Sequence, residues 1–132
     1  MTNDVVKWGV VEGIGTITLN RPEKRNAING EVLEGISRAF SELSLNPEAR
    51  VLLLQGAGSA FSAGIDFNYL ALVARDDGRA PGIRLREGID TIHSILNRIE
   101  QIEKPVVAKI HGFCGGLGLE LVLAADFRIA CE

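Results

Sequence analysis

The chain has 132 residues, of which 46% are hydrophobic and 23% are charged, and its net charge at pH 7 is −3. This length corresponds to about one domain, and the apolar content predicts a globular protein with a core rather than a disordered one. The acidic balance excludes the basic surface that nucleic acids and anionic membranes attract. The longest uncharged stretch, 51–65, is broken by three glycines, so it falls short of the roughly 18 apolar residues of a membrane span.

The chain start and the cysteines indicate the compartment. The first residues lack the basic and hydrophobic regions of a secretory signal. Cys114 and Cys131 form no CxxC pair, and only His93 and His111 could join them, so no zinc site is expected. We therefore expect a soluble, cytoplasmic protein that holds no metal.

The first half of the chain predicts two strands, a helix and a third strand. Segments 5–12 and 14–19 are short and rich in Val, Ile and Thr, which is typical of a hairpin or of two adjacent strands. In segment 30–44 apolar residues recur at helical spacing, and Asn29 supplies an N-cap. Segment 51–54 is continuously apolar, which predicts a strand buried on both faces.

The second half continues this alternation. A short helix is expected from Asp66, and a longer one over 84–103, where isoleucines and leucines form one stripe. Segments 106–110 and 127–130 are predicted as strands, and 119–125 has helical character. Strands that alternate with helices predict an α/β domain with a largely parallel sheet.

Two glycine-bearing turns, 60–66 and 111–120, each follow a predicted strand and lead into a predicted helix. In α/β proteins, ligands generally bind beyond the carboxyl ends of the parallel strands. The first N–H groups of each following helix have no partner inside that helix. If N–H groups from both turns point at one spot, they form an oxyanion hole. On pattern alone, tight turns at helix starts explain these segments more simply.

Common catalytic and phosphate-binding motifs are absent from the sequence. There is no Gly-Lys dipeptide and therefore no P-loop, and the glycines of 116–118 lack the third glycine of a dinucleotide fingerprint. Segment 60–64 differs by one residue from the Gly-x-Ser-x-Gly nucleophile elbow. Asp66 and a histidine could complete a triad, but nothing else favours a hydrolase, so we interpret Ser62 as a turn residue.

Three further blocks stand out: NRPEKRNAI at 20–28, FSAGID at 61–66, and KPVVA at 104–108, which runs into HG at 111–112 and GGLGLE at 115–120. In order and spacing they resemble the crotonase (enoyl-CoA hydratase/isomerase) family, and the resemblance covers nearly the whole chain. It implies the crotonase spiral of ββα turns and acyl-CoA thioester substrates, with coenzyme A as part of the substrate and no separate cofactor. It also implies assembly as a homotrimer or hexamer.

The resemblance assigns residues to the coenzyme A part of the substrate. Arg25 and Ala27 match the segment that lines the nucleotide, where the charged, forked donors of arginine suit a phosphate. The alternative for Arg25 is a solvated loop charge. The remaining matches, in the adenine and pantetheine stretch and in the glycine-rich block, are Ala63, Gly64, Asp66, Phe67 and Gly116.

The backbone N–H groups of Ile65 and Leu117 match the two oxyanion donors of the family. Many members have glycine at the second position, so Leu117 is a departure. If the register shifts, Gly116 or Gly118 would be the second donor. His111 lies at a position that varies in the family, and we expect a structural role for it.

Glu120 matches the catalytic acid/base of the family. In a helix that begins near Leu117 it lies one turn in, and helical side chains lean toward the N-terminus, so its carboxylate would hang over the thioester carbonyl. We expect its apolar neighbours to surround it and favour its protonated form, as proton transfer near neutral pH requires; these are Leu117, Leu119, Leu121 and Val122. The alternative is a carboxylate that only complements the helix dipole.

The length is the largest departure from the family, because its members are usually much longer. We interpret residues 1–132 as the N-terminal part of a crotonase-like domain, without the C-terminal helical part and the second glutamate of the hydratases. The leading hypothesis is an enoyl-CoA hydratase, a lyase of fatty acid metabolism that acts on 2-enoyl-CoA through an oxyanion-stabilised enolate. The alternatives are an enoyl-CoA isomerase and a truncated, non-catalytic fragment that binds coenzyme A or mixes into oligomers.

Overall fold

The computed structural model describes residues 2–3, 5–75, 77–80 and 82–131. Its elements, in chain order, are β1 (Thr2–Asn3), β2 (Val6–Val11), β3 (Ile14–Leu19), the 3₁₀ turn η1 (Pro22–Lys24), α1 (Gly30–Leu45), β4 (Val51–Gly56), α2 (Phe67–Val73), α3 (Ile83–Gln101), β5 (Val106–Ile110), α4 (Leu117–Ala124) and β6 (Phe127–Ala130). Every predicted strand and helix is present with small shifts at its ends. The sequence does not predict β1 and η1.

The strands form one sheet in the order β1-β2-β3-β4-β5-β6. β2 and β3 are an antiparallel hairpin with Val11 opposite Ile14, because Glu12 and Gly13 both adopt positive φ and reverse the chain in two residues. From β3 to β6 neighbouring strands are parallel, and each connection contains at least one helix. The expectation of a largely parallel sheet is confirmed.

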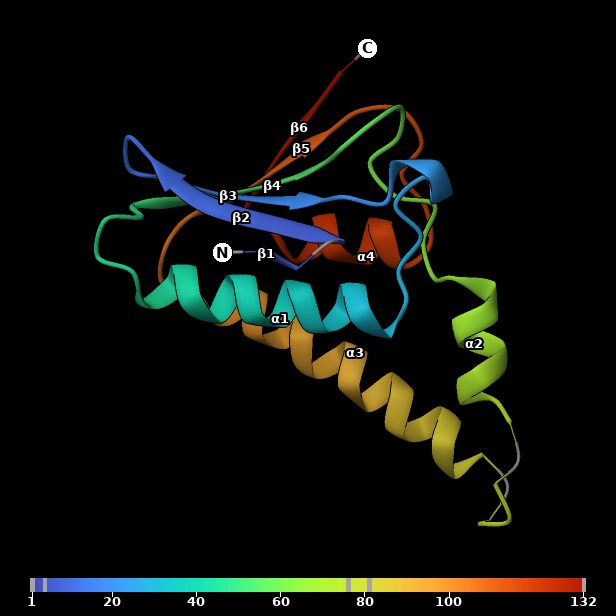
Figure 1. The fold of residues 1–132 in the computed structure, drawn as a ribbon. Helices are drawn as coiled ribbons and strands as arrows, with labels where there is room; N and C mark the ends of the chain where they lie inside the picture. Colours follow the sequence, from blue (N-terminus) through green and yellow to red (C-terminus); the bar gives the residue numbers. More distant parts are fainter. Residues whose placement is uncertain (1, 4, 76, 81, 132) are drawn as a thin grey trace.

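The helices α1, α3 and α4 cover one face of the sheet, as Figure 1 shows. Leu52 and Leu54 of β4 point to that face and are fully buried, whereas Leu53, between them, is half-buried on the other face. The prediction that segment 51–54 is buried on both faces is therefore wrong. Alternate side chains of a strand point to opposite faces, and helices cover only one of them here.

Helix α1 begins and ends where its sequence supplies caps. The side chain of Asn29 accepts a hydrogen bond from the Val32 N–H at 3.0 Å, which confirms the predicted N-cap. At the other end, the Lys104 ammonium donates to the carbonyl oxygens of Leu43 and Asn46 at 2.9 and 2.6 Å. Since these are the terminal carbonyls of the helix, a cation there also suits the helix dipole.

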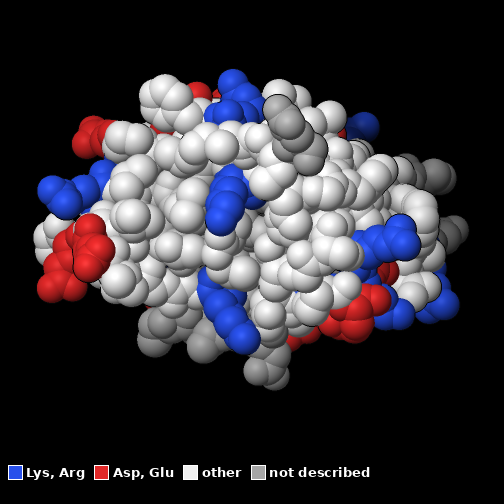
Figure 2. Space-filling view, turned by 90° about the horizontal axis from the view of Figure 1, so that it is seen from above, with Lys and Arg blue, Asp and Glu red and all other residues white. Residues whose placement is uncertain are grey.

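The face of the sheet that the helices leave uncovered is mostly uncharged, with a few separate basic side chains (Figure 2). At the β6 edge, Phe127 and Ile129 are each 61% exposed. Leu119 and Leu123 on α4 are exposed as well. Among the described residues, no helix combines the length and the apolar character that a membrane crossing requires.

Candidate functional site

The turns that follow β4 and β5 lie side by side at the carboxyl end of the parallel strands (Figure 1). Hydrogen bonds join them directly: the Phe61 N–H donates to the His111 carbonyl at 2.8 Å, and the Ser62 N–H donates to the Phe113 carbonyl at 3.2 Å. In return, the Gly115 N–H donates to the Ser62 carbonyl at 3.2 Å. The two glycine-bearing turns of the sequence therefore form one unit.

Glycine is required where these turns touch. A Cβ atom added to Gly64, whose φ is +92°, would lie 2.8 Å from the Gly115 carbonyl oxygen and 3.4 Å from the Leu117 amide nitrogen. A Cβ atom on Gly118 would lie 2.7 Å from the Cβ of Ser62. Such distances leave no room for a side chain at Gly64 or Gly118. The start of α4 can therefore pack directly on the first turn only because both residues are glycine.

The segment before α1 holds the first turn from its other side. The Ala63 N–H donates to the Arg25 carbonyl, the Ile28 N–H to the Gly64 carbonyl, and the Asp66 N–H to the Ile28 carbonyl, each at 2.8 Å. All three sequence blocks of the resemblance are thus brought together, although they are far apart along the chain.

The directions of two N–H groups follow from these bonds. In a trans peptide the C=O of one residue and the N–H of the next point in opposite directions. The Gly64 carbonyl accepts from Ile28, so the Ile65 N–H points away from Ile28. The Gly116 carbonyl accepts from the Glu120 N–H at 3.1 Å, so the Leu117 N–H points out of the N-terminus of α4.

Neither of these two N–H groups, Ile65 or Leu117, donates a hydrogen bond within residues 5–75 and 82–131. The N–H of Gly118 donates to the Gly115 carbonyl at 3.0 Å, which excludes Gly118 as an oxyanion donor. The Gly116 N–H also has no partner among the described residues, so it stays the alternative, but the Leu117 nitrogen is the one among the nearest atoms to a Cβ built on Gly64. Two unpartnered donors, one of them at the positive end of a helix dipole, suit a group that develops negative charge.

Glu120 lies in the first turn of α4, as predicted, but its side chain is exposed. The expectation that apolar neighbours surround it is wrong. Leu121 and Val122 are buried against the sheet, whereas Leu119 is 45% exposed. Consecutive helical residues point in directions about 100° apart, so apolar neighbours in the sequence do not enclose a side chain that projects from the opposite face.

Asp66 has a structural role that the sequence did not assign to it. Its carboxylate caps α2 by accepting from the N–H groups of Asn68 and Tyr69, and it pairs with the Arg21 guanidinium at 3.2 Å. Burial raises the pKa of Asp66, but the hydrogen bonds from Tyr69, Arg21 and Asn68 outweigh it and leave the pKa below its ordinary value. Arg21 also donates to the Ala27 carbonyl.

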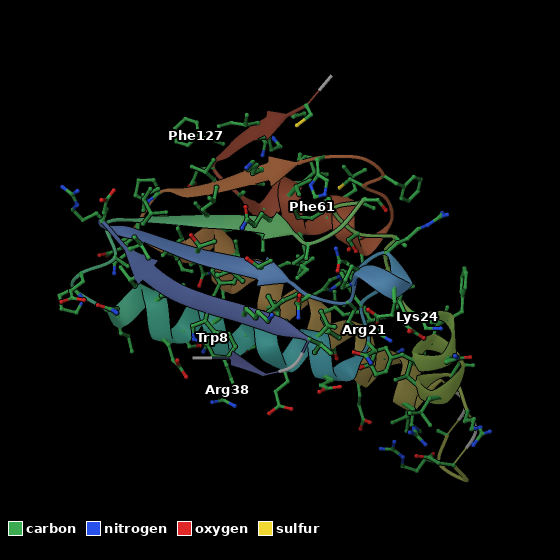
Figure 3. The ribbon with its side chains drawn as sticks, turned by 45° about the horizontal axis from the view of Figure 1, so that its top comes forward. Trp8, Arg21, Lys24, Arg38, Phe61 and Phe127 are labelled. Carbon is green, nitrogen blue, oxygen red and sulfur yellow. The ribbon has the colours of Figure 1, made fainter. Side chains whose placement is uncertain are left out.

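The predicted nucleotide-binding residues lie beside this ion pair. Arg25 is exposed and adopts positive φ at the end of η1, and Phe67 is 82% exposed at the start of α2. Arg21 and Lys24 lie at the same end of the sheet (Figure 3). Of these three basic residues, Lys24 and Arg25 are exposed and available to an anionic group, whereas Arg21 is held by Asp66. The coenzyme A contacts themselves stay a prediction.

Two buried polar residues hold the first turn. The sequence predicts only a turn role for Ser62 and no role for Asn26. Ser62 is fully buried, and its hydroxyl donates to the Asn26 carbonyl at 2.8 Å and accepts from the Gly64 N–H at 3.1 Å. This confirms Ser62 as a turn residue. The Asn26 amide nitrogen donates to the carbonyls of Ala57, Ala60 and Phe61. The signal for Asn26 was its place inside the 20–28 block.

Other features of the described residues lie apart from the two donors. The His111 ring nitrogen Nε2 is 2.7 Å from the Gly58 carbonyl oxygen, in agreement with a structural role. A cavity of about 600 Å³ lies between α1, α2 and α3 beside Leu33, Tyr69 and Ile95, and no predicted site residue lines it. No cluster of three or more potential metal ligands exists within the described part of the chain.

Comparisons with known proteins identify the family of the chain. The family model described as enoyl-CoA hydratase/isomerase matches residues 9–132. The peroxisomal Delta(3,5)-Delta(2,4)-dienoyl-CoA isomerase of Arabidopsis thaliana is 34% identical, and the match covers 99% of this chain and 49% of that protein. The mitochondrial enzyme of the same name from Mus musculus is 37% identical over 88% of this chain and 37% of its own length.

Solved structures show the same fold. A putative enoyl-CoA hydratase/isomerase (crotonase) from Legionella pneumophila superposes with a TM-score of 0.89 at 25% identity, over 98% of this chain and 48% of the other. The chain thus spans about half the length of the proteins it matches, or less. Its mixed α/β architecture is that of the crotonase fold, and the chain belongs to the enoyl-CoA hydratase/isomerase family.

Proposed function

We propose that this chain binds acyl-CoA thioesters and stabilises their enolates between the N–H groups of Ile65 and Leu117. The observation that carries this proposal is that both groups lack a partner within the described residues, on turns that touch at Gly64. An enolate oxygen placed there would accept two hydrogen bonds. A single donor of this kind typically contributes on the order of 10²–10³ in rate.

The reaction that we propose is hydration of a 2-enoyl thioester. The oxygen of water bonds to the β-carbon while a base takes one of its protons, and the π electrons of the double bond move through the α-carbon onto the thioester oxygen to form an enolate. The carbonyl then re-forms as the α-carbon takes a proton from the protonated acid/base group. Glu120, three residues after Leu117 on α4, is our candidate for the proton transfer. Hydratases of the family divide this work between two carboxylates, and this chain supplies one of them.

Isomerisation of a double bond is the second candidate. A base removes one proton from the enoyl thioester to form a dienolate, whose thioester oxygen carries the negative charge, and that proton returns at another carbon, so one acid/base group is enough. The relatives from Arabidopsis thaliana and Mus musculus are named dienoyl-CoA isomerases, which favours this reaction. A chain that binds coenzyme A thioesters without turnover is the remaining alternative.

Binding of the nucleotide part, assembly and location complete the proposal. Arg25 and Ala27 would line the nucleotide. The rest of coenzyme A would be lined by Ala63, Asp66, Phe67 and the adjacent glycines.

We expect the chain to assemble as a homotrimer or hexamer. The cytoplasmic location stays a prediction, since the names of the two relatives place those proteins in the peroxisome and the mitochondrion.

The proposed enolate site is tested by removing one N–H group. Leu117 is the first residue of α4, where proline is tolerated because the N–H has no partner inside the helix. We expect wild-type chain to bind acetoacetyl-CoA as its enolate, with the matching change in ultraviolet absorbance. Leu117→Pro should lose this signal, whereas Leu117→Ala, which keeps the N–H, should retain most of it. Equal enolate signals for Leu117→Pro and Leu117→Ala would refute the assignment.

The reaction itself is tested with crotonyl-CoA in D₂O. Loss of the enoyl absorbance reports hydration, and deuterium entry at the γ-carbon without hydration reports isomerase-type proton transfer. Glu120→Gln should abolish whichever of the two the wild type performs. If both proteins bind the thioester and neither exchanges protons, the chain is the non-catalytic binder.

A further inference from the structure

Ser62 joins the three blocks that form the site, and we call it their junction. Its backbone N–H and C=O both engage the second turn, through Phe113 and Gly115. Its hydroxyl engages the first turn and the segment before α1, donating to the Asn26 carbonyl and accepting from the Gly64 N–H. All the polar groups of this residue are therefore used, and the side chain is fully buried.

Both oxyanion donors depend on this junction. The Gly64 N–H that Ser62 holds belongs to the residue directly before Ile65, so this bond and the Ile28 bond to the Gly64 carbonyl fix the same residue from its two sides. On the α4 side, Gly118 packs against Ser62 so closely that a Cβ there would lie 3.0 Å from the hydroxyl oxygen. One short side chain thus contacts both donor segments, which also touch each other directly at Gly64.

Asn26 braces the junction from outside. Its carbonyl accepts from the Ser62 hydroxyl, and its amide nitrogen donates to the carbonyls of Ala60 and Phe61, which precede Ser62 directly. Asn26 itself has positive φ and is 1% exposed. Because asparagine tolerates this conformation better than most residues, the brace is held without a glycine.

We propose that Ser62 is a positioning residue that sets the spacing and direction of the Ile65 and Leu117 N–H groups. This inference rests on the proposed function, in which those groups hold an enolate oxygen. Serine fits because its hydroxyl both donates and accepts while occupying little volume. Misplacement of a catalytic donor by about 1 Å can cost on the order of 10²-fold in rate.

The experiment compares Ser62→Ala with Ile36→Val in the core of α1, which is a destabilised variant remote from the turns. For each protein, binding of coenzyme A and the enolate fraction of bound acetoacetyl-CoA are measured at saturation. We expect the affinity of Ser62→Ala for coenzyme A to stay within about twofold of the wild-type affinity. Its ratio of bound enolate to bound ketone should fall about tenfold. Ile36→Val should keep that ratio. An unchanged ratio in Ser62→Ala overturns the inference.

A second measurement does not depend on activity. In the unliganded whole chain, Ser62→Ala should speed hydrogen exchange at the Gly64 amide by about tenfold or more and shift the Ile65 and Leu117 amide resonances. Ile36→Val should shift neither resonance. If wild type forms no enolate, the proposed function fails, while these amide shifts still decide the positioning inference. Unmoved Ile65 and Leu117 resonances would overturn it.

Discussion

The two turns present the same group, a backbone N–H without a partner among the described residues, but side chains contribute differently to holding them in place. Polar side chains brace the turn after β4: Asn26 donates to three carbonyls, and the Ser62 hydroxyl bridges two backbone groups. The turn after β5 is shaped by missing side chains, since Gly112 and Gly116 adopt positive φ and Gly118 packs onto Ser62. An added Cβ should therefore disturb both turns, since Gly64 of the first turn also has positive φ and a close neighbour, whereas the loss of side-chain hydrogen bonds should disturb mainly the first.

The largest effect is expected from adding one carbon to the second turn. Gly112→Ala places a Cβ against the Ser59 carbonyl oxygen at a residue with φ +57°. The strain of alanine at positive φ and the overlap of its Cβ with the carbonyl oxygen add up. We therefore expect the free energy of unfolding to fall by about 3–4 kcal/mol. Gly78→Ala is the matched control, because Gly78 also has positive φ but no atom of the described residues within 4 Å of an added Cβ. It should cost about 1 kcal/mol. Equal losses in denaturant titrations would contradict this account of the second turn.

A smaller loss is expected from removing the brace of the first turn. Asn26→Ala leaves the carbonyls of Ala57, Ala60 and Phe61 without their side-chain donor in a buried site. These lost hydrogen bonds, together with the strain of alanine at the positive φ of this position, should lower the free energy of unfolding by about 2–3 kcal/mol. Asn97→Ala, at an exposed position on α3, should change it by less than about 0.5 kcal/mol. Similar melting curves for the two variants would show that the brace is not needed.

The contrast between the turns also explains what the sequence could predict. Helices and strands follow from local periodicity and caps, so their positions are recovered, and Asn29 caps α1 as expected. The hydrogen bonds of Asn26 and Ser62 join residues 31 to 36 positions apart, which no local pattern contains. The exposure of Glu120 depends on how α4 is rotated against the sheet, and that is a property of the packing.

The glycines of the second turn are the clearer signal in the sequence. A glycine-rich run such as 112–118 by itself indicates positive φ and close approach of two backbones. For Asp66 the sequence predicts a substrate contact and the start of a short helix, whereas its capping and ion-pair partners become visible only when α2 and Arg21 are placed. Braces made of side chains are therefore harder to predict than turns made of glycine.

The smallest effect concerns the Arg21–Asp66 pair at the edge of the first turn. The pKa of Asp66 is lowered in the folded chain, so its contribution to stability is present above about pH 4, the ordinary value, and is lost as the pH falls through the lowered pKa. Asp66→Asn keeps an N-cap but removes the charge. We expect wild type to be more stable at pH 7 by roughly 1 kcal/mol and the difference to vanish in acid. A difference that does not change with pH would contradict the charge assignment.

The central claim is that the N–H groups of Ile65 and Leu117 receive the thioester oxygen. Amide NMR spectra of the chain titrated with acetoacetyl-CoA, and separately with coenzyme A alone, test it most directly. Our account predicts that the thioester, but not coenzyme A, moves the Ile65 and Leu117 amide protons downfield by more than any other amides. If both resonances stay in place while the thioester binds, or if the largest shifts lie in the cavity between α1 and α3, the claim is contradicted.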